Sequence, residues 1–192
     1  MTHETQPIIP GSDKSRRIYL TGFMGSGKST IGPILANTLG YAFVDVDKAI
    51  ELQTGKAVKA IFGDHGEQYF RKLERALIRD LTARQHIVIS LGGGTIADPV
   101  NFPVIRESGI VVYLKTAPEQ LFKRLHYKTD RPSLVDLAGE RLSEEALWVR
   151  IQELFARREK FYECADIIIR TDERRLGVTV DELVKRLASL IE

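Results

Sequence analysis

The chain has 192 residues, 43% hydrophobic and 28% charged, which is the composition of one ordinary globular domain. Its 28 Lys and Arg against 26 Asp and Glu give a formal net charge of +2, and this near balance argues against a general nucleic-acid binder. A single cysteine excludes an internal disulfide and no apolar run is long enough to cross a bilayer, so we expect a cytoplasmic protein without a membrane partner.

The first 16 residues are polar and contain Pro7, Pro10 and Gly11, without the apolar core of a signal peptide. We predict that residues 1–16 are a disordered leader and that residues 17–192 form one domain. The four histidines are scattered without the spacing of metal ligands, so a zinc site is not expected.

Five short apolar, β-branched runs are predicted as strands, and segments with the three-and-four spacing of helices separate them. The runs around Ile87–Ile89 and Ile110–Val112 are apolar at successive positions, as in strands that are covered on both faces. Strands that alternate with helices predict an α/β fold with a parallel sheet. The five runs are Arg17–Leu20, Ala42–Val46, His86–Leu91, Ile110–Leu114 and Asp166–Ile169.

The first strand leads into Gly22-Phe-Met-Gly-Ser-Gly-Lys28-Ser29, which matches the phosphate-loop pattern G-x-x-x-x-G-K-[ST]. Glycines allow successive backbone amides to curl around phosphate oxygens, at the start of a helix whose dipole already favours anions. Ser29–Leu39 can form that helix. The pattern predicts a nucleoside triphosphate site, with Lys28 on the β- and γ-phosphates and the Ser29 hydroxyl on Mg²⁺.

Asp45 and Asp47 follow the second strand, and as strand residues two apart they would point to the same face. In parallel sheets the carboxyl ends of the strands border the ligand crevice. One carboxylate is therefore a candidate for Mg²⁺ and the other for holding or deprotonating an acceptor hydroxyl; a solvated turn is the alternative.

Two arginines occupy helix faces that otherwise look inward. Arg71 and Glu74 share a face with Ile78, and Arg158 continues the stripe of Ile151 and Leu154. Because an unpaired buried cation is costly, each needs a partner. Structural salt bridges or snorkelling side chains would satisfy this, and so would a double-arginine grip on a small carboxylate substrate.

Two loops stand out after later strands. Gly92–Gly94 follows the third strand, where three glycines permit close approach of a ligand to the backbone, although an ordinary flexible turn would read the same. Residues 127–140 lack periodicity over a length that is unusual inside a compact domain, which is typical of a functional loop such as a lid.

Together these residues resemble the shikimate kinase family from about Arg17 to the C-terminus. The match consists of the phosphate loop Gly22–Thr30, Asp-Val-Asp at residues 45–47, Phe-Arg-x-x-Glu at residues 70–74, the triplet Gly92–Gly94, Asp-Arg-Pro at residues 130–132 and Arg-x-x-x-Tyr at residues 158–162. Each motif is short, but their occurrence together in this order is highly specific.

The resemblance implies a three-layer α/β/α fold with a five-stranded parallel sheet, a mobile lid at about residues 115–141 and a monomer. It implies transfer of the γ-phosphoryl group of ATP to the 3-hydroxyl of shikimate, a step of chorismate and aromatic amino-acid biosynthesis, with Mg²⁺ as cofactor and the two small molecules as partners. In such transfers, positioning and charge stabilisation account for most of the catalysis.

The resemblance also implies roles for single residues. Asp47 would bind the acceptor hydroxyls and orient or deprotonate the nucleophile, while Lys28 and a lid arginine, Arg131, would act on the phosphates. Ser29 and Asp45 would serve Mg²⁺, Asp45 through water, and Glu74 would hold Arg71. The nucleotide would contact Gly25, Ser26, Gly27, Lys28, Ser29, Thr30, Arg124, Arg131 and Arg175. Shikimate would contact Asp47, Arg71, Gly92, Gly93, Gly94 and Arg158.

Other functions remain open at this point. Another small-metabolite kinase, such as a gluconate kinase, would share the phosphate loop but has no need for two arginines that bind a ring acid. A nucleoside monophosphate kinase fits less well. A non-catalytic relative that binds nucleotide would be indicated by the loss of Lys28, Asp47, Arg71, Arg131 or Arg158, and all five are present.

Overall fold

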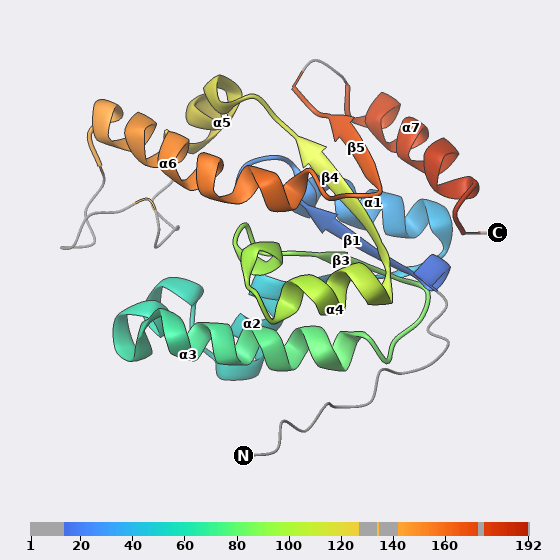
Figure 1. Ribbon diagram of the computed structural model, residues 1–192, viewed down its shortest axis with the longest axis horizontal. Helices are drawn as coiled ribbons and strands as arrows, with labels where there is room; N and C mark the ends of the chain where they lie inside the picture. The colour runs from blue at the N-terminus through green and yellow to red at the C-terminus, as the bar shows by residue number, and fades with distance from the viewer. Residues whose placement is uncertain (1–13, 127–133, 135–141, 173–174, 192) are drawn as a thin grey trace.

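The sheet of the protein has five parallel strands, as the sequence predicts (Figure 1). The computed structural model describes residues 14–126, 134, 142–172 and 175–191. The strand order is β2-β3-β1-β4-β5, so the phosphate-loop strand lies at the centre. The strands are β1 Arg17–Thr21, β2 Ala42–Asp45, β3 Ile87–Ser90, β4 Ile110–Lys115 and β5 Ile167–Arg170.

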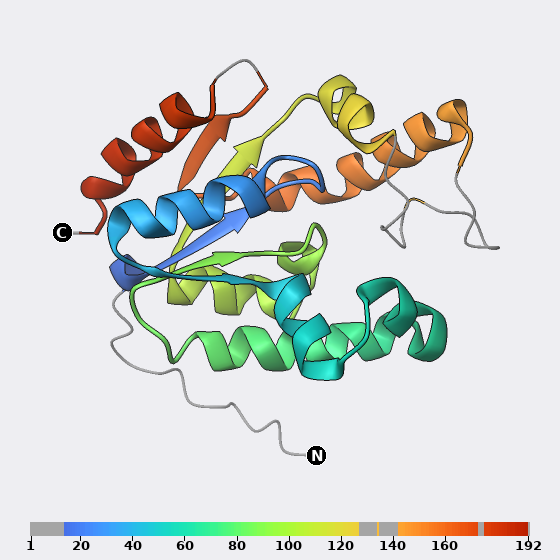
Figure 2. The same ribbon diagram turned by 180° about the vertical axis from the view of Figure 1, so that it is seen from behind.

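Helices cover both faces of this sheet. Figure 1 shows α3, α4 and α6 in front of the strands, and Figure 2, from behind, shows α1 and α7 on the opposite face. This three-layer arrangement confirms the predicted fold. The helices are α1 Lys28–Leu39, α2 Val46–Thr54, α3 Val58–Leu81, α4 Asn101–Ser108, α5 Pro118–Leu125, α6 Glu144–Tyr162 and α7 Leu176–Ala188, with short 3-10 helices η1 Lys14–Arg16 and η2 Thr95–Ala97.

Alternate residues of each strand fill two separate cores. Tyr19 of β1 and Ile89 of β3 pack in the core beneath α3, α4 and α6, while Leu20 and Val88 pack in the core beneath α1 and α7. Successive residues of a strand point to opposite faces, so a strand that is buried on both faces must be apolar at every position. This explains why the sequence patterns of these strands are continuous rather than alternating.

The carboxyl ends of the strands lie at one edge of the sheet, because all five strands are parallel. The phosphate loop follows β1, Asp47 follows β2, and Gly92–Gly94 follows β3, which lies between β1 and β2. The chain order of the motifs therefore becomes a spatial cluster at this edge, as expected for ligand crevices in open α/β sheets.

One local prediction was wrong. Asp47 is not a strand residue that points the same way as Asp45, because β2 ends at Asp45 and Asp47 lies in the first turn of α2. Asp45 is the N-cap residue, and its Oδ1 accepts a hydrogen bond from the Lys48 amide at 3.3 Å. A carboxylate at this position satisfies a free amide at the helix start, which ends the strand one residue earlier than its apolar pattern suggests.

The predicted leader up to residue 13, and most of the predicted lid, lie outside the described residues. Within the predicted lid range of 115–141, the structure describes α5, which packs against α6. The other described residue of that range beyond His126 is Leu134, which is buried in the core on the α6 side.

Candidate active site

The phosphate loop between β1 and α1 has the backbone that its glycines permit. Gly22, Gly25 and Gly27 all have positive φ, and a Cβ at Gly22 would lie 2.7 Å from the Leu114 carbonyl oxygen. The buried Lys28 folds back over the loop, and its Nζ donates to the Gly22 and Phe23 carbonyls at 2.8 and 3.0 Å. The ammonium is thus held at the loop that would surround phosphate oxygens.

Oxygen ligands gather where the loop enters α1. The Ser29 hydroxyl donates to Asp45 Oδ2 at 2.9 Å, and the Ser90 hydroxyl at the end of β3 donates to the same oxygen at 3.1 Å. A hydroxyl and a carboxylate beside a phosphate loop are the hard oxygen donors that suit Mg²⁺, which usually keeps several waters and needs few protein ligands. Within the described residues no three acidic, His or Cys side chains form a metal cage.

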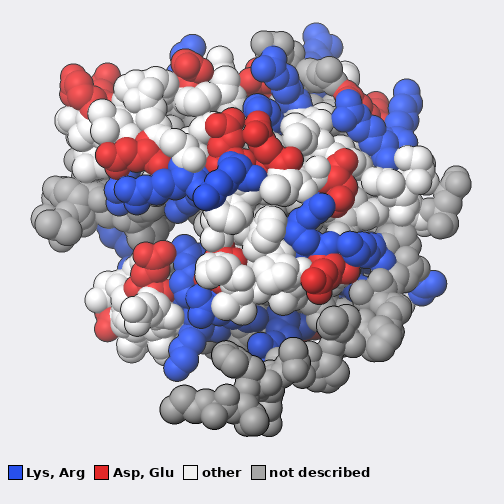
Figure 3. Space-filling model, in the orientation of Figure 1, with Lys and Arg blue, Asp and Glu red and all other residues white. Residues whose placement is uncertain are grey.

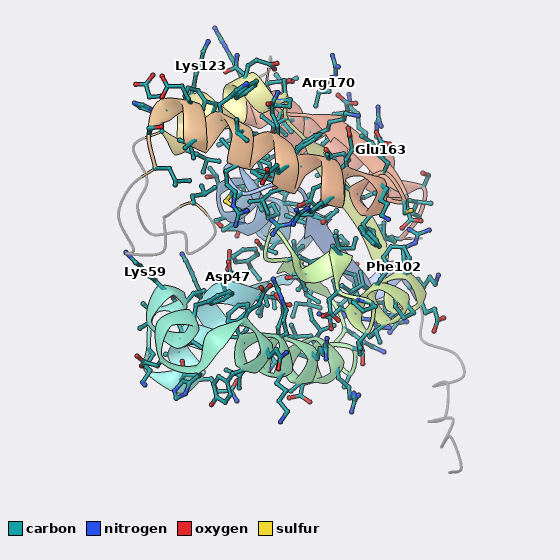
Figure 4. All side chains as sticks on the ribbon, turned by 60° about the vertical axis from the view of Figure 1, so that its left-hand side comes forward. Asp47, Lys59, Phe102, Lys123, Glu163 and Arg170 are labelled. Atoms are coloured by element: carbon teal, nitrogen blue, oxygen red, sulfur yellow. The ribbon has the colours of Figure 1, made fainter. Side chains whose placement is uncertain are left out.

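Asp47 lies next to the glycine loop. A Cβ on Gly92 would be 2.8 Å from Asp47 Oδ1 and 2.9 Å from Thr95 Oγ1, so Gly92 leaves room for these two side chains. Figure 4 shows Asp47 at the edge of α2 and α3 that faces α6. Asp47 lines the cleft between these helices, where an acceptor hydroxyl could reach it.

A fully buried carboxylate holds Arg71. Glu74 Oε2 accepts from Arg71 Nη1 at 2.8 Å, and Glu74 Oε1 accepts from the Thr95 hydroxyl at 2.6 Å. Burial raises the pKa of the Glu74 carboxyl, and the Asp47 carboxylate adds to this, whereas Arg71 and Thr95 favour the ionised form. On its open side, Arg71 also contacts Glu67, whose side chain is 64% exposed.

Arg158 approaches the same place from α6. The position that a Cβ of Gly94 would occupy is 2.9 Å from Arg71 Nη2 and 3.5 Å from Arg158 Nη2, so both guanidinium groups meet over one glycine. The Arg158 guanidinium also lies over the Phe23 ring of the phosphate loop, 5.9 Å from its centroid. Two planar cations that converge on one point form a site for a small carboxylate.

These groups line one large cleft of about 1270 Å³. Figure 3 shows the surface hollowed between α6 and α3, with Lys and Arg side chains on both sides of the hollow. Asp47, Glu74, the two converging arginines and the three glycines all belong to its lining. The structure thus brings together every acceptor-side residue that the sequence singles out.

The structure brings only some of the predicted nucleotide-binding residues to the phosphate loop. Arg124 of α5 donates from Nη1 to the Gly25 carbonyl at 3.0 Å and from Nη2 to the Thr171 carbonyl at 3.3 Å, which places it over the phosphate loop. Arg175 is exposed just before α7, and no contact among the described residues joins it to that loop. Arg131 lies outside the described residues, so its role stays a prediction.

The sequence did not single out some polar side chains that lie at the cleft or beside it. Ser90 is a short polar residue at the end of a buried strand, and that contrast could have marked it as a site residue. The pair of Arg75 and Asp98, with Nη2 to Oδ2 at 2.8 Å, lies beside Arg71 in the cleft. Burial works against ionisation of Asp98, but Arg75 and the amides of Val100 and Asn101 together hold its pKa below the usual value.

The described part of the chain contains no helix that is long and apolar enough to span a membrane.

Comparison with known proteins agrees with this geometry. The family model "Shikimate kinase" matches residues 24–188. A shikimate kinase of Chlorobium chlorochromatii is 51% identical over 170 residues, which cover 88% of this chain and 90% of that protein. A shikimate kinase of Chlorobaculum tepidum is 45% identical over the same number of residues, which cover 88% of this chain and 89% of that protein.

Solved structures give the same result. A shikimate kinase of Acinetobacter baumannii, in complex with shikimate, superposes with a TM-score of 0.82 at 32% identity, covering 92% of this chain and 95% of that chain. A gluconokinase of Sinorhizobium meliloti superposes with a TM-score of 0.54 at 19% identity, covering 93% of this chain and 94% of that chain. The second likeness shows a shared fold alone.

We expect Glu74→Gln to lower the free energy of unfolding by about 2 to 4 kcal/mol, because it leaves the Arg71 guanidinium without its buried charged partner. Glu67→Gln is the matched control, since it neutralises the exposed partner of the same guanidinium and should cost less than about 1 kcal/mol. Urea denaturation of the two variants measures both values. Equal losses would show that Glu74 is not the principal partner of Arg71.

Proposed function

Because the chain belongs to the shikimate kinase family, we propose that its cleft transfers the γ-phosphoryl group of ATP to the 3-hydroxyl of shikimate, giving shikimate 3-phosphate and ADP. The observation that carries this proposal is the meeting of Arg71 and Arg158 over Gly94, beside the Asp47 carboxylate. A carboxylate and a hydroxyl on one small molecule are the groups that this arrangement suits.

On the acceptor side, the two arginines would bind the carboxylate of the ring acid. Asp47 would accept a hydrogen bond from the attacking hydroxyl and orient it, or take its proton. The backbone of Gly92–Gly94 would contact the ring hydroxyls, since the glycines leave the space next to Asp47 and the guanidinium groups free of side chains. Fixing both ends of a small substrate in this way supplies the orientation on which the transfer depends.

In the transfer, the acceptor oxygen forms a bond to the γ-phosphorus while the bond from that phosphorus to the β–γ bridging oxygen breaks. The hydroxyl proton leaves toward Asp47, and ADP departs with the bridging oxygen. The protein's contribution is to place donor and acceptor in line and to stabilise the charge on the phosphoryl oxygens.

On the donor side, the phosphate loop would surround the phosphates with the amides of Gly25–Thr30, and Lys28 would exchange its loop carbonyls for phosphate oxygens. Arg124 would contact the nucleotide from above the loop, as its bond to Gly25 suggests. Ser29, with Asp45 acting through water, would hold Mg²⁺, which neutralises the phosphate charge when bound. Arg131 would close over the phosphates from the lid, and Arg175 would lie near the adenine.

Two alternatives are disfavoured. A gluconate kinase shares the fold, but it has no need for two arginines that bind the carboxylate of a ring acid. The likeness to the gluconokinase, at 19% identity, supports nothing beyond the fold. A non-catalytic nucleotide binder would not need Asp47 beside a cleft that also holds Arg71 and Arg158. We further propose that the enzyme acts as a cytoplasmic monomer with ATP and shikimate as its partners.

An ADP-release assay with competing acceptors tests the proposed function. With Mg²⁺ and ATP present, shikimate should stimulate ADP release by at least about a hundredfold over the rate without acceptor, while gluconate and nucleoside monophosphates should not. If gluconate or a nucleoside monophosphate were the better acceptor, the proposal would be wrong.

We expect Asp47→Asn to reduce kcat by at least about a thousandfold, because the amide cannot take the hydroxyl proton and orients the nucleophile poorly. ATP affinity, measured by calorimetry, should stay within about twofold, since Asp47 lies on the acceptor side. Asp64→Asn, on the exposed part of α3, is the control and should keep full activity. Normal turnover in Asp47→Asn would refute the role given to this carboxylate.

A further inference from the structure

Tyr162 connects α6 to the glycine loop. It is the last residue of α6, its side chain is fully buried, and its hydroxyl donates a short hydrogen bond to the Gly93 carbonyl, 69 positions away in the chain. The arginine four residues earlier, Arg158, lies one helical turn from it and approaches the same loop. Tyr162 therefore ties the helix that carries one substrate arginine to the backbone that lies beneath both.

The hydrogen bond from Tyr162 to the Gly93 carbonyl also sets the orientation of the neighbouring Gly94 amide. In a trans peptide, the carbonyl of Gly93 and the amide of Gly94 point in opposite directions. The three glycines line the cleft, whereas Tyr162 is not among the described residues that do. With its carbonyl held toward Tyr162, the Gly93–Gly94 peptide has its amide pointing away from Tyr162, at the cleft-lining glycine that Arg71 and Arg158 both approach.

The rest of the environment supports a fixed, neutral donor. Tyr113 of β4 stacks on the Tyr162 ring, with centroids 5.2 Å apart and an angle of 29°, so the ring is held against the sheet. Burial raises the pKa of the Tyr162 hydroxyl to about 12, although Arg158 works against this shift. The hydroxyl keeps its proton, and its bond to Gly93, throughout the physiological pH range.

We propose that Tyr162 is a positioning residue for the acceptor substrate: through its hydroxyl it holds the Gly93–Gly94 peptide with the amide pointing away from Tyr162 and sets the separation between that peptide and Arg158. This inference rests on the proposed function. Tyr162 is not among the described residues that line the cleft, so its removal should affect acceptor binding through the Gly93–Gly94 peptide and Arg158 without altering the nucleotide site.

The test compares Tyr162→Phe with Tyr113→Phe. Each variant removes one hydroxyl from the same stacked pair, but the Tyr113 hydroxyl has no hydrogen-bond partner among the described residues, so this change is the matched control. Tyr162→Phe should raise KM for shikimate about tenfold, because the Gly93 carbonyl loses its buried partner. Its KM for ATP and its kcat should stay within about twofold of wild type, and Tyr113→Phe should leave all three constants within about twofold.

A second measurement tests the inference even if part of the Tyr162→Phe protein fails to fold. Amide hydrogen exchange of residues 91–97 in the folded fraction should be faster than in wild type and in Tyr113→Phe, whereas exchange in α1 should not change. If wild type phosphorylates shikimate, an unchanged KM for shikimate in Tyr162→Phe would overturn the inference. Equal rises of the KM for shikimate and the KM for ATP in Tyr162→Phe, or the same rise of the KM for shikimate in Tyr113→Phe, would also overturn it. A wild type that does not phosphorylate shikimate would overturn the proposed function as well.

Discussion

The site depends on keeping two like charges close together. Arg71 and Arg158 repel each other where they meet over Gly94. The local sequence places each arginine on the inward face of its helix, but only the folded chain brings α3 and α6 together. The fully buried Glu74 offsets this repulsion by fixing one guanidinium from behind, with Thr95 holding its second oxygen. What remains is an excess of positive charge directed into the cleft, and a small anion is the partner that completes it.

The parallel sheet makes this arrangement possible. Three neighbouring strands each deliver one part of the site at their carboxyl ends: the phosphate loop from β1, Asp45 from β2 and the glycine loop from β3. Side-chain hydrogen bonds then connect the parts across the strand ends, as Ser29 and Ser90 do through Asp45. The net charge of +2 is consistent with two anionic substrates, because a few placed cations do the binding and the remaining charges balance.

The sequence predicted the fold because its signals were strong: continuous apolar runs placed all five strands. The phosphate-loop pattern predicted the turn between β1 and α1 where Lys28 and Ser29 lie, and their roles toward phosphate and Mg²⁺ stay predictions. Asp47 was assigned to the wrong element because helix capping by Asp45 is a local hydrogen-bond effect that strand periodicity does not reveal. The bonds that Ser90 and Tyr162 make cross the molecule, so only the folded chain could show them.

The central claim is that Arg71 and Arg158 bind the substrate carboxylate, and the affinity of the enzyme for a charged over a neutral form of the substrate tests it most directly. Isothermal titration of the wild-type enzyme with shikimate and with its neutral methyl ester should show at least about a tenfold preference for shikimate, since the ester offers no anion to the guanidinium pair. That preference should disappear in Arg71→Met and in Arg158→Met. If the ester bound wild type as tightly as shikimate, or if either variant kept the full preference, the two arginines would not be the carboxylate site.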